Sequence, residues 1–117
     1  ILALAVFLFV TILGFVKNKE LFYRSIDLLI HPAKLEAFGM VISESLAMGV
    51  TPLCSSECGA SEIIKEGTGA SLPHNSEISI WAEKASELLE SNYVVDYRRD
   101  WSTVATEYKK IYSEIFT

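Results

Sequence analysis

Apolar and polar residues alternate along this chain in blocks whose lengths predict strands and helices. Residues 10–15 and 28–31 are almost continuously apolar, which is typical of parallel strands covered on both faces. Residues 50–55 and residues 68–72 predict a third and a short fourth strand. Short helical patterns lie between these runs, over residues 20–25, 39–48 and 62–66.

The last part of the chain predicts two amphipathic helices. Apolar residues recur at helical spacing from Trp81 to Leu89 and again from Trp101 to Ile115. Strand and helix alternate before them. The sequence therefore predicts an α/β fold, an open parallel Rossmann-like sheet with right-handed crossovers followed by two C-terminal helices.

The N-terminal run is more ambiguous than the others. Residues 1–9 are an apolar leader, and as a helix residues 1–16 would span only about 24 Å of a hydrocarbon core of about 30 Å. No lysine or arginine precedes the run, so it lacks the charged region of a signal peptide. A strand with an undefined leader and a membrane-associating helix both stay open. The chain begins at Ile1 without a methionine, so we expect a piece of a longer protein.

Composition and charge limit the kinds of molecule and metal ion that this chain is expected to bind. The formal net charge is -5 and no basic cluster stands out, so nucleic acid is not an expected partner. We interpret Cys54 and Cys58 as reduced thiols, because two cysteines are too few for a disulfide scaffold and their spacing does not suit zinc. No Asp-x-Asp motif occurs, so we expect no metal and no cofactor.

The candidate chemistry lies just after the strand at residues 28–31. Glu36 follows the carboxyl end of that strand, the edge where ligands bind to open parallel sheets. Gly39 then leads into a helix whose N-terminal amides and dipole suit a phosphate, and Glu44 on that helix can accept hydrogen bonds from a ribose diol. These residues suggest a nucleoside diphosphate sugar held by two carboxylates in one crevice. Two solvated glutamates flanking a turn are the alternative.

This stretch resembles the retaining, nucleotide-sugar-dependent glycosyltransferases of the GT-B fold, specifically the group 1 family (family four). The resemblance rests on residues 36–44, Glu-Ala-Phe-Gly-Met-Val-Ile-Ser-Glu, on Ala-Met-Gly at 47–49, and on the glycine-rich residues 59–69. It implies that Glu36 is the catalytic residue and holds the donor sugar, and that Glu44 binds the ribose. It also implies that the backbone amides of Phe38, Gly39 and Met40 touch the sugar and diphosphate and that Val41 packs beside the nucleoside.

The resemblance further implies an organisation and a setting. Residues 10–117 would be part of the C-terminal nucleotide-sugar-binding domain, with the N-terminal, acceptor-binding domain missing, so this chain alone should turn over nothing. The donor would be UDP- or GDP-linked, and the acceptor a glycan, lipopolysaccharide or other glycoconjugate. The sequence His-Pro-Ala at 31–33 is nearest to lipopolysaccharide-core glucosyltransferases. We expect a cytoplasmic enzyme with peripheral contact to the inner face of the membrane. The alternative is a non-catalytic α/β remnant or interaction module that binds no nucleotide.

Overall fold

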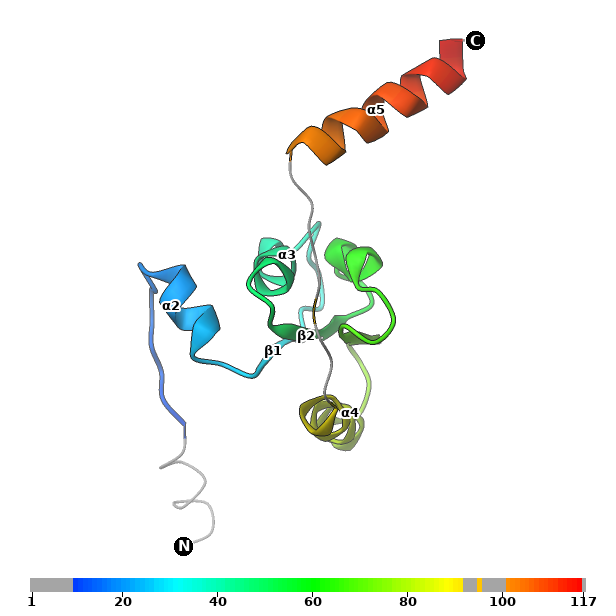
Figure 1. Cartoon of the computed structure of the whole chain (residues 1–117). Coiled ribbons are helices and arrows are strands. Elements are labelled where there is room, and N and C mark those ends of the chain that lie inside the picture. The colour runs from blue at the N-terminus through cyan, green and yellow to red at the C-terminus, as the bar shows by residue number, and fades with distance from the viewer. Residues whose placement is uncertain (1–9, 92–94, 96–100, 117) are drawn as a thin grey trace, which may run out of the picture.

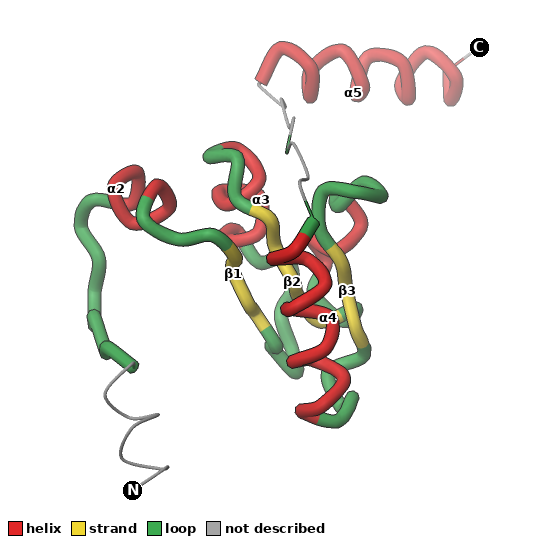
Figure 2. Tube along the Cα trace, turned by 60° about the horizontal axis from the view of Figure 1, so that its bottom comes forward, coloured by secondary structure: helices red, strands yellow, loops and turns green. Residues whose placement is uncertain are grey.

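The centre of the protein is a parallel sheet. The computed structural model describes residues 10–91, 95 and 101–116. Its strands, β1 (Leu28–His31), β2 (Thr51–Ser55) and β3 (Ala70–Leu72), lie side by side in that order (Figure 2). β1 and β3 each pair with β2 in parallel, Leu28 opposite Thr51 and Leu53 opposite Ala70. The predicted parallel α/β arrangement is confirmed.

The helices covering the two faces of this sheet are α3 (Met40–Ala47) and α4 (Ile78–Glu90). The other helical elements are α2 (Lys19–Arg24), the 3₁₀ turn η1 (Gly59–Ile63) and α5 (Trp101–Phe116). Figure 1 shows α3 above the sheet, α4 below it and α5 away from it. The apolar side chains of α5 from Tyr108 onward are largely exposed. Within the described residues, every helix is too short or too polar to cross a membrane.

The core lies between α3 and the sheet. Ile42 and Leu46, one helical turn apart and therefore on the same face of α3, are 0% and 2% exposed. Together with Cys54, Cys58 and Ala60 they form the buried cluster of the core. Burying each large aliphatic side chain contributes about 1.5–3 kcal/mol, so this contact fixes α3 on the sheet.

Two predicted elements differ in the structure. Residues 10–15 do not form a strand, and Ile12 and Phe15 are 90% and 89% exposed. A strand is stable only when a neighbour pairs with its amides and carbonyls, and no described strand lies beside this run. The helix predicted at residues 62–66 is instead the earlier turn η1. By contrast, the helix predicted at residues 20–25 is confirmed as α2, which buries Tyr23. The leader at residues 1–9 lies outside the described residues.

Candidate functional site

The loop from β1 to α3 carries the predicted site, and residues after β2 hold it in place. Pro32 follows β1 and has no amide hydrogen with which to continue the ladder. The buried Ser55 hydroxyl donates a hydrogen bond to the Ala33 carbonyl oxygen. At the other end of the loop, the carbonyl oxygen of Phe38 accepts from the Cys58 thiol at 2.9 Å and from the Ala60 amide at 2.7 Å. The loop is therefore fixed at both ends.

Two glycines let the loop and the segment after β2 pack this closely. Gly39 has φ +90°, and a Cβ added there would lie 2.5 Å from the Cys58 sulfur and 3.3 Å from Glu36 Cγ. A Cβ on Gly59 would collide with the carbonyl oxygen of Ala37. A larger residue at either position would push the loop outward, so the position of Glu36 depends on both glycines.

Glu36 lies beside the histidine that ends β1. Its Oε2 is 3.6 Å from Nε2 of His31, beyond hydrogen-bond distance, and its side chain is 38% exposed. That nitrogen of His31 is shielded from solvent and has no hydrogen-bond partner in the described part of the chain. The carboxylate of Glu36 is thus only loosely engaged, and it keeps its capacity to accept hydrogen bonds from a ligand.

The N-terminus of α3 begins directly after this loop. Gly39 is the N-cap, and no side chain of the described residues caps the helix. The first amides of a helix have no intrahelical acceptor and carry the positive end of the dipole. The side chains of Phe38 and Met40 are 43% and 63% exposed, so this turn lies at the surface. Val41 instead is half-buried against the core.

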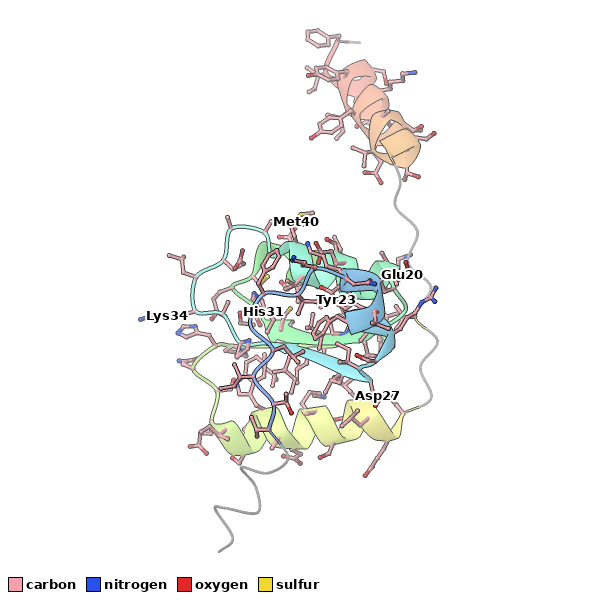
Figure 3. The ribbon with its side chains drawn as sticks, turned by 90° about the vertical axis from the view of Figure 1, so that its left-hand side faces the viewer. Glu20, Tyr23, Asp27, His31, Lys34 and Met40 are labelled. Atoms are coloured by element: carbon pink, nitrogen blue, oxygen red, sulfur yellow. The ribbon has the colours of Figure 1, made fainter. Side chains whose placement is uncertain are left out.

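Glu44, one turn further along α3, is held by α2. Its Oε2 accepts a hydrogen bond from the Tyr23 hydroxyl at 2.9 Å, and its Oε1 is 2.9 Å from Nζ of Lys19. Tyr23 is 3% exposed, and its burial and its bond to Glu44 raise the pKa of the phenol well above its usual range. Figure 3 shows Tyr23 reaching from α2 toward the body of the molecule. Sequence reasoning missed both partners, since 21 and 25 residues separate them from Glu44.

The two glutamates therefore have separate partners. Beside Glu44 lies a mostly apolar cavity of about 230 Å³, lined by Lys19, Glu20, Tyr23, Glu44, Ala47 and Met48. Glu36 is not among its lining residues. The crevice shared by both carboxylates stays a prediction, whereas the Glu36 side chain does lie near the N-cap of α3, because a Cβ on Gly39 would be 3.3 Å from Glu36 Cγ.

Residues 5–108 match the sequence profile of the family described as "Glycosyl transferases group 1". The chain belongs to this family. It is also similar to the D-inositol 3-phosphate glycosyltransferase of Corynebacterium efficiens, with 28% identity over 106 residues. That match covers 81% of this chain and 25% of the relative, so the chain spans about a quarter of the relative's length.

Family membership and the parallel sheet together identify a partial Rossmann-like domain of a group 1 glycosyltransferase. The matched residues contain the whole loop from β1 to α3. Among the described residues of this domain, no group of three or more histidine, cysteine, aspartate and glutamate side chains could hold a metal ion. The expectation of a metal-free, cofactor-free site stays a prediction.

Proposed function

We propose that this chain is the donor-binding part of an enzyme that transfers a sugar, with retention of configuration, from a nucleoside diphosphate sugar. The acceptor is a glycan, a lipopolysaccharide or another glycoconjugate, with a lipopolysaccharide core as the nearest candidate. One observation carries the proposal. The side chain of Glu36 lies near Gly39, the N-cap of α3, since a Cβ on Gly39 would be 3.3 Å from Glu36 Cγ. No side chain of the described residues caps that helix, so a carboxylate that can bind a sugar and a helix end that suits a phosphate are close together.

Each residue then has one task. Glu36, as the catalytic residue, holds hydroxyls of the donor sugar near the reacting carbon. The amides of Phe38, Gly39 and Met40 receive the sugar and the diphosphate. Glu44 accepts hydrogen bonds from the ribose hydroxyls, with Val41 beside the nucleoside.

The helix N-terminus also serves the chemical step. As the bond from the sugar to phosphate breaks, negative charge grows on the departing phosphate, and fixed amide donors stabilise that charge without a metal. The departing oxygen takes the proton of the acceptor hydroxyl, and the new bond forms on the same face of the sugar. That geometry retains the anomeric configuration.

The remaining parts of the reaction belong to the rest of the enzyme. An N-terminal domain supplies the acceptor site, so we expect no turnover by this chain alone. The donor is UDP- or GDP-linked. The enzyme works in the cytoplasm, with peripheral contact to the inner face of the membrane.

The second candidate is a non-catalytic α/β module that binds no nucleotide. One observation favours it: both oxygens of Glu44 already have partners, Tyr23 and Lys19, as expected of a structural carboxylate. The ammonium group of Lys19 lies on a side chain that is 64% exposed, so a ligand can displace it at little cost.

Calorimetric titration with UDP and GDP separates the two candidates. We expect saturable binding of one nucleotide, weakened about tenfold or more by Glu44→Ala, because each lost charge-assisted hydrogen bond is worth about 1.5–3 kcal/mol. Glu90→Ala, at an exposed position on α4, is the matched control and should leave the affinity unchanged. Flat titrations with both nucleotides would favour the non-catalytic module.

The role of Glu36 needs the full-length enzyme. There, Glu36→Ala should abolish sugar transfer while the circular dichroism spectrum stays that of the wild type. Glu66→Ala, at an exposed position after η1, serves as the control. Unchanged transfer by Glu36→Ala would refute the catalytic assignment.

A further inference from the structure

The side chain of Tyr23 connects α2 to the carboxylate of Glu44. Its hydroxyl lies 2.9 Å from Glu44 Oε2 and 3.4 Å from the carbonyl oxygen of Val41. A hydroxyl has one hydrogen to donate, and the closer, charged acceptor takes it. The ring is 3% exposed and packs edge-on against Phe22, with centroids 5.3 Å apart. Tyr23 is therefore a fixed donor.

Lys19, the second partner of Glu44, differs from Tyr23 in its exposure to solvent. Lys19 also lies 2.9 Å from the carboxylate, but its side chain is 64% exposed and flexible. An exposed ion pair is screened by solvent and holds its partner weakly. Tyr23, which is buried, is thus the group that sets the direction of the Glu44 carboxylate.

A carboxylate has about four lone-pair positions on its two oxygens. Tyr23 occupies one on Oε2 and Lys19 one on Oε1. No other group in the described part of the chain takes the remaining two positions, one on each oxygen. Two acceptors at the spacing of one carboxylate match the adjacent hydroxyls of a ribose.

We propose that Tyr23 is a positioning residue that fixes Glu44 in the orientation needed to accept hydrogen bonds from both ribose hydroxyls of the nucleotide. This inference rests on the proposed function. Without the Tyr23 hydroxyl, Glu44 turns among several rotamers, and the gain from the second ribose hydroxyl is lost. Tyr23 thereby makes the site selective for a ribonucleotide over a deoxyribonucleotide.

The test compares UDP with 2′-deoxy-UDP, and GDP with 2′-deoxy-GDP, by calorimetry on the 117-residue chain. The wild type should prefer the ribonucleotide about tenfold, which corresponds to one hydrogen bond to a charged group. Tyr23→Phe removes a single oxygen atom and should reduce that preference to about twofold. The matched control, Tyr108→Phe on the exposed face of α5, should keep the tenfold preference.

The ratio of the two affinities also separates positioning from folding. Partial unfolding of Tyr23→Phe would lower both affinities by the same factor and leave the ratio unchanged. A Tyr23→Phe variant that keeps the wild-type preference would overturn the role of Tyr23 and leave the proposed function standing. A wild type that binds neither nucleotide, or binds without preference, would refute the proposed ribose contact of Glu44 and this inference with it.

Discussion

Replacing Gly39 by alanine tests whether the loop from β1 depends on the close approach of the Gly39 backbone to the side chain of Cys58. Gly39 has φ +90°, which L side chains rarely adopt, and an added Cβ would lie 2.5 Å from the sulfur of Cys58. That sulfur has little room to withdraw, because Cys58 is 0% exposed and its thiol is bonded to the Phe38 carbonyl oxygen. Gly39→Ala should therefore destabilise the fold and move Glu36.

The loss of stability expected for Gly39→Ala has two contributions. A left-handed backbone costs a residue with a Cβ about 1–2 kcal/mol, and overpacking a filled core costs about 1–3 kcal/mol. We expect a total loss of about 3 kcal/mol in the free energy of unfolding. Gly49 is the matched control, since it has φ +76° but nothing within 4 Å of an added Cβ. Gly49→Ala should cost only the backbone part, about 1–2 kcal/mol.

Urea denaturation followed by circular dichroism measures both variants. The double variant Gly39→Ala with Cys58→Ala removes the sulfur that the new methyl group meets, so it should recover about 1–2 kcal/mol relative to the sum of the single changes. Equal losses for Gly39→Ala and Gly49→Ala, or strict additivity of Gly39→Ala and Cys58→Ala, would refute the packing argument.

The remaining predictions concern the segments around the site. Ser55→Ala should cost about 1–3 kcal/mol in urea denaturation, because it leaves the Ala33 carbonyl oxygen without its donor. Hydrogen bonds from His74 hold the pKa of Glu57 below its ordinary value, so their stabilisation is present above pH 5 and is lost as the pH falls through that lowered pKa. Burial and the neighbouring thiol raise the pKa of Cys54 to about 12, so iodoacetamide at pH 8 should modify it only after unfolding.

Each of these three predictions can be checked against a control variant or against a result that would contradict it. Ser79→Ala on the exposed face of α4 should be neutral, and an equal loss there would deny Ser55 its role. Glu57→Gln should be less stable than the wild type at pH 6, and the difference in stability should narrow as the pH falls; a difference that does not change with pH would contradict the pKa argument. Rapid alkylation of Cys54 in the native chain would show that its burial is incomplete.

The sequence predicted the central elements well because their signals are local. The apolar run at Leu28–His31 ends at a proline, and the helix Met40–Ala47 lies between two glycines, so both elements appear where expected. The order of Glu36, Gly39 and Glu44 along the strand, loop and helix follows from the same local rules.

The errors come from interactions between distant segments. Residues 10–15 have the composition of a buried strand, but composition does not supply a neighbouring strand, and Phe15 is 89% exposed. The pairing of Glu44 with Tyr23 and of Cys58 with Phe38 joins residues 21 and 20 positions apart. No pattern in the sequence marks such pairs. The family resemblance predicted the site as a region, and this stays a prediction, while the contacts that hold its residues became visible only in three dimensions.

The central claim is that the loop from β1 and the N-terminus of α3 bind the diphosphate end of a nucleotide sugar. Amide chemical-shift mapping during titration of the ¹⁵N-labelled chain with UDP or GDP tests it most directly. We predict that the largest shifts fall on residues 36–44, led by the amides of Phe38, Gly39 and Met40, and that they saturate. Shifts absent from these amides, or concentrated instead on α4 and β3, would contradict the account.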